Sequence, residues 1–122
     1  MNDNLIEITK NGQTKSPKLP DHLKNYIVDI DGIICEDCPN EDIERMKIVS
    51  EISGAKEKIN ALFEAGNIIT FFTSRTNEQH KEITENWLRE HGFKCHKIIF
   101  NKPRGGNYIF VDDRGLEFKT SL

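Results

Sequence analysis

The sequence predicts an α/β domain, a Rossmann-like parallel β-sheet with helices on both faces. Two observations point to this fold class. Short apolar runs alternate with amphipathic helical stretches from residue 25 onward, which is the pattern of repeated strand–helix–strand units. The run Ile68–Thr73 is apolar almost throughout, as is typical of a strand buried on both faces of a parallel sheet. At 122 residues, the chain has the length of one domain.

Residues 1–24 differ in character from the predicted core at 25–122, and we expect them to form an N-terminal extension. The run Leu5–Thr9 favours a short strand, and Asn11-Gly12 is a strong signal for a hairpin turn. The two prolines in Ser16–Pro20 then interrupt regular structure. The extension is therefore predicted to be a small β-ribbon.

The core is predicted to open with a short strand at Tyr26–Val28, which leads into the turn Asp29-Ile30-Asp31-Gly32. Residues 33–50 are acidic and show no period, so we expect an irregular flap there. A helix is predicted over 53–65, because its apolar residues fall on one face. Gly66 stands where a glycine commonly ends a helix.

A second helix is predicted after the buried strand. Thr76 with Gln79 three residues later forms a capping box, and the helical period continues to His91. Two further apolar runs, at Lys97–Phe100 and Tyr108–Val111, are predicted to be the third and fourth strands of the sheet.

The charge balance and the cysteine count exclude several function classes. The chain has 17 basic and 20 acidic residues, for a net charge of −3, which argues against binding nucleic acid or a membrane surface through bulk charge. The apolar runs are too short for a membrane-spanning helix, and the first residues do not resemble a signal peptide. Three cysteines, an odd number, predict a reducing, cytoplasmic location rather than a disulfide framework.

Polar clusters follow directly after each of the four predicted strands. In an open parallel sheet the carboxyl ends of the strands line one crevice, and ligands bind there. We therefore expect four clusters to converge on one site: Asp29-x-Asp31, Thr73-Ser74-Arg75, Lys102 and Asp112-Asp113.

The contents of this expected site favour magnesium and phosphate. Several carboxylates held close together repel each other unless a cation neutralises them. An all-oxygen site without histidine at any strand end favours Mg²⁺ over Zn²⁺. A lysine and hydroxyl groups beside such a cation suit a phosphate group. The sequence thus predicts Mg²⁺ as cofactor and a small phosphorylated substrate.

At these residues the sequence resembles the haloacid dehalogenase (HAD) superfamily of phosphohydrolases. The first motif of that family, an apolar strand followed by D-x-D-G, is similar to Tyr26–Gly32. The others are a strand ending in Thr or Ser, a lysine, and an acidic pair after a strand. They match Thr73, Lys102 and Asp112-Asp113, in the order of the family. The resemblance covers residues 25–114.

The resemblance implies catalytic roles for four residues. Asp29 would attack phosphorus and become an aspartyl-phosphate. Asp31 would protonate the leaving oxygen and then activate water. Thr73 would hydrogen-bond the phosphoryl group, and Lys102 would offset the negative charge around it.

The resemblance also implies a set of magnesium ligands. Asp112 would bind Mg²⁺ together with the Asp29 carboxylate and the backbone carbonyl of Asp31, and Asp113 would be a further ligand or lie just outside the ligand shell. The result would be a phosphomonoester hydrolase.

The finer pattern of the motifs is similar to small HAD proteins associated with capsule and surface-sugar biosynthesis, which implies a sugar phosphate or related metabolite as substrate. We expect substrate contacts from Gly32, Ser74, Arg75 and Arg104, and a surface role for the two arginines stays open. Between Asp31 and the helix predicted at 53 there is room for a flap but not for a cap domain.

A capless site needs another means of excluding water during phosphoryl transfer. We therefore expect a homo-oligomer, in which a neighbouring subunit covers the site. The edge of the ribbon predicted in residues 1–24 is a candidate for that contact, because unpaired strand edges readily pair with another chain.

Alternatives stay open at the sequence level. The DxD turn and Lys102 could be an ordinary acidic turn and a solvated loop lysine. A phosphatase of nucleic-acid 3′ ends is disfavoured by the acidic balance, and a non-catalytic HAD-fold binding module is disfavoured by the intact motifs. Cys35 and Cys38 with Cys95-His96 resemble a zinc ligand set. However, adjacent ligands tend to point apart, and thiols in a flap beside the site are favoured.

Overall fold

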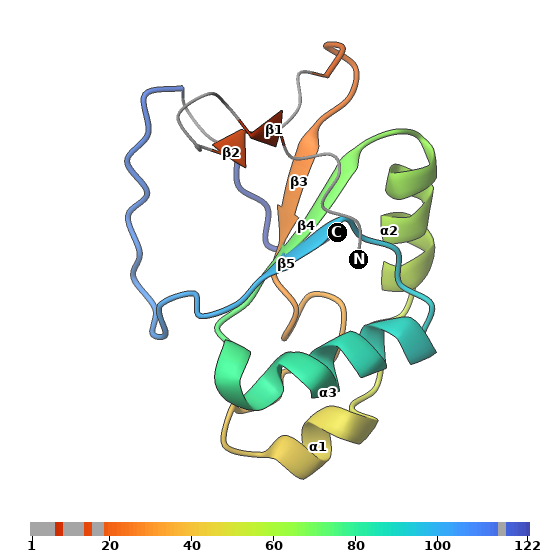
Figure 1. The fold of residues 1–122 in the computed structure, drawn as a ribbon, viewed down its shortest axis with the longest axis vertical. Helices are drawn as coiled ribbons and strands as arrows, with labels where there is room; N and C mark the ends of the chain where they lie inside the picture. Colours follow the sequence, from red (N-terminus) through yellow and green to blue (C-terminus); the bar gives the residue numbers. More distant parts are fainter. Residues whose placement is uncertain (1–6, 9–13, 16–18, 115–116) are drawn as a thin grey trace.

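The structure is a computed structural model, and it describes residues 7–8, 14–15, 19–114 and 117–122 (Figure 1). Near the N-terminus, β1 (Glu7–Ile8) pairs antiparallel with β2 (Thr14–Lys15). Both segments lie within the predicted β-ribbon. The predicted turn at Asn11-Gly12 lies outside the described residues.

The core contains a parallel sheet, as the sequence predicts. Its strands are β3 (Asn25–Val28), β4 (Ile68–Phe72) and β5 (Lys97–Ile99), in the order β3-β4-β5. The register places Val28 opposite Phe71 and Phe71 opposite Ile98. β4 is the middle strand of the described sheet. Its side chains Ile69 and Phe71 are buried, whereas Thr70 and Phe72 on the other face are half-buried, so the predicted burial on both faces is met on one face only.

The two predicted crossover helices are α2 (Ala55–Glu64) and α3 (Asn77–Glu90). The Thr76 hydroxyl caps α3 by accepting a hydrogen bond from the Gln79 backbone N–H, as the capping box predicts. A further short helix, α1 (Ile43–Ile48), lies in the stretch predicted to be irregular. Its six residues, with Met46 as the buried one, are too few to show a helical period.

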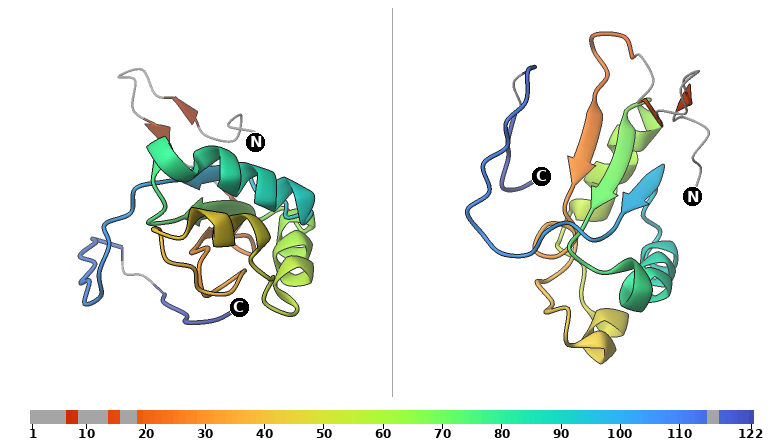
Figure 2. Two further views of the ribbon diagram at one scale, coloured as in Figure 1. Left: turned by 90° about the horizontal axis from the view of Figure 1, so that it is seen from below. Right: turned by 60° about the vertical axis from the view of Figure 1, so that its left-hand side comes forward.

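One face of the sheet is covered by the helices. The helices and strands share a single core, which contains Ile59, Trp87 and Leu88 from the helices, Val28, Ile69 and Phe71 from the strands, and Ile30 from the turn after β3. Figure 2 shows α2 behind β3 and β4, with the C-terminal segment apart from the strands.

The opposite face of the sheet is open in the part of the chain that the structure describes. Ile27 is 69% exposed and Ile99 is 41% exposed, while Thr70 and Phe72 between them are half-buried. The α/β parallel fold is confirmed, but both crossover helices pack on one face rather than on the two faces predicted. Both crossovers step across the sheet in the same direction, and right-handed connections then place their helices on the same side.

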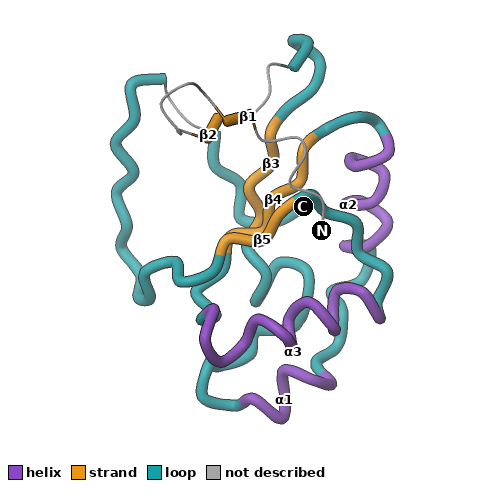
Figure 3. The backbone as a smooth tube through the Cα atoms, viewed as in Figure 1, coloured by secondary structure: helices purple, strands orange, loops and turns teal. Residues whose placement is uncertain are grey.

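The predicted fourth strand at Tyr108–Val111 is not part of the sheet, and this is a correction to the sequence analysis. The segment is without strand pairing, with Ile109 89% and Val111 92% exposed. Figure 3 shows the chain after β5 as a long loop that swings away from the strands. Left-handed residues at Asn101 (φ 67°) and Asn107 (φ 64°) turn the chain before and after Lys102.

Residues 33–54 hold α1 and loops, with no larger element between β3 and α2. None of the helices in the described ranges is both long and apolar enough to cross a membrane.

Candidate functional site at the carboxyl ends of the strands

The structure brings three of the four predicted clusters to one end of the sheet. Asp29 and Asp31 follow β3, Thr73 follows β4, and Lys102 lies beyond β5. Two backbone hydrogen bonds fix the last two segments together: Thr73 N–H donates to the Ile99 carbonyl at 3.0 Å, and Lys102 N–H donates to the Thr73 carbonyl at 2.9 Å.

Asp29 and Lys102 form the exposed pair of the site. The Lys102 Nζ lies 3.3 Å from Asp29 Oδ2, and the backbone N–H of Ile30 donates to Asp29 Oδ1 at 2.8 Å. The Asp29 side chain is 41% exposed, whereas that of Lys102 is 20% exposed and lies over the Phe72 ring. An oriented carboxylate that solvent can reach, next to a cation, suits a nucleophile for a phosphate ester.

Asp31 and Arg75 form a second, buried pair. Arg75 Nη2 donates to Asp31 Oδ1 at 2.8 Å, and Nε donates to Oδ2 at 3.1 Å, which is a two-pronged contact. The Arg75 side chain is 1% exposed, so the prediction that it binds substrate is not met. Burial opposes the charged form of Arg75, but the contact with Asp31 outweighs it and raises the pKa of Arg75.

Thr73 and Ser74 are held by the chain around them. Thr73 is fully buried, and its hydroxyl oxygen accepts a hydrogen bond from the Arg75 backbone N–H at 3.1 Å. The Ser74 carbonyl accepts from the Asn40 side-chain amide at 2.8 Å, which ties the flap to the end of β4. The hydroxyl proton of Thr73 is left free by this acceptor contact, but the residue has no exposed surface.

The two remaining candidates for substrate contact, Gly32 and Arg104, lie next to the flap. Gly32 has a left-handed backbone (φ +86°), and its N–H donates to the Cys35 carbonyl at 2.9 Å, which closes the turn after Asp31. Arg104 is exposed and reaches the flap at Glu41, with Nη1 to Oε1 at 2.8 Å. The hydrogen bond from Arg104 lowers the pKa of Glu41.

His80 anchors the flap, a role that the sequence analysis missed. It is fully buried on α3; its Nδ1 accepts from the Thr76 N–H at 2.8 Å, and its Nε2 then donates to the Asn40 carbonyl at 2.9 Å. The signal available in the sequence was the inward position of His80 on the helix. Asn40, in a stretch without period, gave no signal.

The residues present do not form a magnesium site in this arrangement. No group of three or more acidic, histidine or cysteine side chains is close enough to hold an ion within the described ranges. Asp112 accepts from the backbone N–H of Arg114, and Asp113 lies 4.0 Å from the Arg114 guanidinium. The predicted convergence of this acidic pair with Asp29 is not met, because the segment before it does not pair with the sheet.

The cysteines lie in two different places. Cys35 is buried beside the site, 3.8 Å from Asp31 Oδ1, and burial, followed by the Asp31 charge, raises its pKa to about 12. Burial also raises the pKa of Cys38, and it raises that of Cys95 to about 11. Cys95 lies with Phe63 and Phe93 at the α2–α3 side of the core rather than at the flap.

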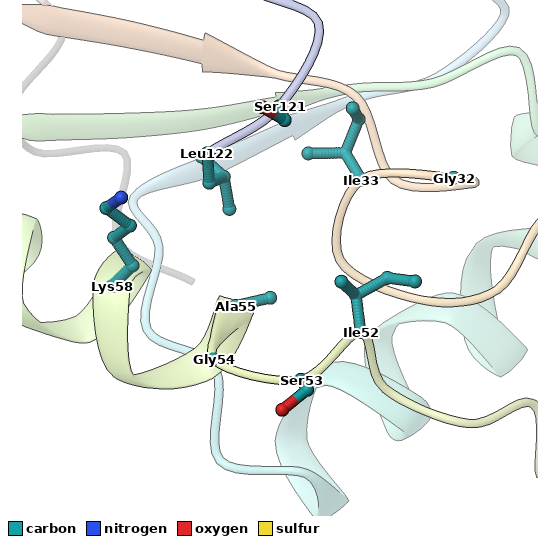
Figure 4. Close-up of a pocket in the computed structure, with 9 residues that line it drawn as sticks. All are labelled: Gly32, Ile33, Ile52, Ser53, Gly54, Ala55, Lys58, Ser121 and Leu122. Atoms are coloured by element: carbon teal, nitrogen blue, oxygen red, sulfur yellow. The ribbon is translucent and has the colours of Figure 1, made fainter.

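A cavity of about 330 Å³ lies between the turn after β3 and the start of α2, away from Asp29 and Lys102 (Figure 4). It is bounded by Gly32 and Ile33, by the start of α2, and by Ser121 and Leu122. Gly32 is the one predicted site residue in its wall. The cavity therefore lies next to the strand ends without including the charged groups there.

Comparisons with known proteins support the fold. No family model matches the chain, and no curated protein is significantly similar to it. A crystal structure of a structural-genomics target from Vibrio cholerae is similar, with a TM-score of 0.58 and 22% sequence identity. The match covers 77% of this chain and 83% of that one. At this identity, the likeness shows a shared fold and nothing about activity.

Proposed function

We propose that the chain is a HAD-type phosphomonoester hydrolase that acts through an aspartyl-phosphate on Asp29. The observation that carries the proposal is the pairing of Asp29 with Lys102 across the ends of β3 and β5, at 3.3 Å. Asp29 is oriented by one backbone N–H and remains 41% exposed. A phosphate ester can reach it there.

The proposed reaction has two steps. Asp31 enters the first step protonated: the Asp29 carboxylate attacks phosphorus and forms an O–P bond, the bond from phosphorus to the ester oxygen breaks, and that oxygen takes the proton of Asp31, which is left as the carboxylate that pairs with Arg75. Water then attacks the aspartyl-phosphate and gives up a proton to Asp31, which releases phosphate and restores Asp29. The Lys102 ammonium offsets the negative charge of the transferring group in both steps.

The proposed substrate is a small phosphate ester such as a sugar phosphate. The net charge of −3 gives no support for a nucleic-acid substrate. Arg104, exposed and extended toward the flap at Glu41, is the proposed contact for the remainder of the substrate. The three unpaired cysteines support action in the reducing cytoplasm.

Mg²⁺ is the proposed cofactor, and its binding requires a rearrangement of the segment after β5. Asp112 and Asp113 must approach Asp29, which requires the Tyr108–Val111 run to pair with the free edge of β3. Two observations support this condition: among the described residues β3 has a partner strand on one edge only, and Ile109 and Val111 lie exposed. Hydrogen exchange tests it, because backbone amides at 109–111 should gain protection when Mg²⁺ is added.

A second copy of the chain is proposed to cover the site. The open face of the sheet supports this, because Ile27 and Ile99 are exposed there in the described structure. Sedimentation should then give a mass above that of one chain.

Turnover tests the proposal. The protein should hydrolyse 4-nitrophenyl phosphate when Mg²⁺ is present, and Asp29→Asn should abolish that activity while the fold is kept. A panel of sugar phosphates set against 3′-phosphorylated oligonucleotides should show preference for the sugar phosphates. Absence of turnover across the whole panel would contradict the proposal and favour a binding module.

A further inference from the structure

Arg75 is a buried cation with its donors committed to the chain itself. Its side chain is 1% exposed, and Nη1 donates to the Thr84 hydroxyl on α3 at 3.0 Å. Nη2 also lies 3.8 Å from Cys35 Sγ. A guanidinium held this way cannot bind substrate. It can therefore affect the reaction only by positioning the groups that it contacts.

The backbone of Arg75 is held as firmly as its side chain. Its N–H donates to the Thr73 hydroxyl at 3.1 Å, and its carbonyl accepts from the Asn101 N–H at 2.9 Å. Arg75 therefore joins the end of β4 to the turn that carries Lys102. Its guanidinium joins the same point to α3 and to the turn after β3.

The contact that matters for chemistry is the one with Asp31. A guanidinium fork that donates to both oxygens fixes the plane of a carboxylate as well as its distance. The Asp31 side chain retains 12% exposure, against 41% for Asp29. Arg75 takes one acceptor site on each oxygen, and a carboxylate has about four. Proton exchange at the remaining sites stays open.

We infer that Arg75 is the positioning residue for Asp31, and that it aims the carboxyl group that exchanges protons with the leaving oxygen and with water. This inference rests on the proposed function and adds a residue to it. A Lys at position 75 supplies the charge but not the fork, so it should leave Asp31 paired but free to rotate.

Leaving-group dependence tests this role. An ester with a poor leaving group, such as glycerol 3-phosphate, needs a proton from Asp31, whereas 4-nitrophenyl phosphate needs little help. General acid catalysis contributes about 10²–10⁴-fold to the rate of such steps, and a misoriented Asp31 should lose part of this rate enhancement. We expect Arg75→Lys to lower kcat at least about tenfold for the alkyl ester, and less than about threefold for the aryl ester. KM should stay unchanged for both.

A second variant keeps the test decisive if Arg75→Lys does not fold. Thr84→Val removes the Nη1 hydrogen bond and leaves both contacts between Arg75 and Asp31 in place. It should lower kcat less than Arg75→Lys does, and its kcat should again fall more for the alkyl ester than for the aryl ester. Ile59→Val is the matched control, because Ile59 is fully buried in α2 and outside the site; it should lower stability without changing the ratio of the two kcat values.

Equal losses for the two esters in both Arg75→Lys and Thr84→Val would overturn the inference, and so would no loss in either. The proposed function fails by a different result, namely full turnover by Asp29→Asn. The two failures are therefore distinguishable in one set of assays.

Discussion

The two carboxylates of the Asp29-x-Asp31 motif should differ sharply in their effect on stability, although both are proposed to be essential for activity. Asp31→Asn removes the negative charge beside a guanidinium that is 1% exposed. Asp29→Asn removes the charge beside a lysine at the surface of the site. The substitutions are chemically identical and lie two residues apart, so each serves as the control for the other.

The magnitudes follow from burial. Removing one partner of a buried ion pair costs about 3–5 kcal/mol, because the other charge stays buried without compensation. Asparagine keeps one acceptor oxygen for Arg75, which favours the lower figure of about 3 kcal/mol. A partly exposed pair such as Asp29–Lys102 contributes about 0–1 kcal/mol.

The expected shifts in melting temperature are well separated. Unfolding entropy is about 2.1 cal/mol/K per residue. For a chain of 122 residues, a loss of about 3 kcal/mol then lowers Tm by about 12 °C. The corresponding shift for Asp29→Asn is less than about 4 °C. Urea unfolding at neutral pH, followed by circular dichroism, measures both free energies directly.

A double variant shows whether the stability loss comes from leaving the Arg75 charge without its partner Asp31. Replacing a buried ion pair by apolar residues of similar volume is often neutral or stabilising. Asp31→Leu with Arg75→Met should therefore be more stable than Asp31→Asn alone. A Tm for Asp31→Asn within about 4 °C of the wild type would refute the reasoning, since it would mean that Arg75 is not a buried charge dependent on Asp31.

Three further predictions concern other parts of the chain. Burial lowers the pKa of His96 below its usual 6.5, and its Nδ1 accepts from the Ile69 N–H. The unfolded chain then binds more protons just below pH 6.5, so stability should fall as the pH drops through that window. His96→Gln should flatten the slope seen by urea unfolding between pH 5 and 7.5. The raised pKa values of Cys35, about 12, and of half-buried Cys95, about 11, keep both side chains as thiols at pH 8, so both should react with iodoacetamide only after unfolding, and rapid labelling of either one in the native protein would contradict this. Deleting residues 1–20 should dissociate the proposed oligomer and lower activity, and a fully active monomer in sedimentation would show that the extension covers no site.

The sequence predicts the strands and helices whose pattern is long or centrally buried. The apolar run at Ile68–Phe72 marks the middle strand, and the capping box at Thr76 marks the start of α3. The helix α1 escaped prediction because a helix of six residues spans fewer than two turns. The run Tyr108–Val111 has a strand-like composition, but composition does not determine pairing, and in the structure the run lies exposed.

The part of the candidate site that lies directly at the strand ends could be predicted from the sequence. Asp29 and Lys102, which are 73 positions apart, meet because parallel strands end at the same edge of a sheet. The role of Arg75 was not predictable, because an arginine after a strand is usually exposed, and its burial depends on Thr84 and Asp31 from distant segments. Pairings of this kind arise from tertiary packing and leave no period in the sequence.

The central claim is that Asp29 carries the phosphoryl group during turnover. Borohydride reduces an aspartyl-phosphate to homoserine, so quenching the protein with it during hydrolysis of 4-nitrophenyl phosphate, followed by peptide mass spectrometry, identifies the acceptor residue. The account predicts homoserine at position 29 in the wild type and none at any position in Asp29→Asn. Homoserine at Asp31 or at another carboxylate, or turnover without any trapped residue, would contradict it.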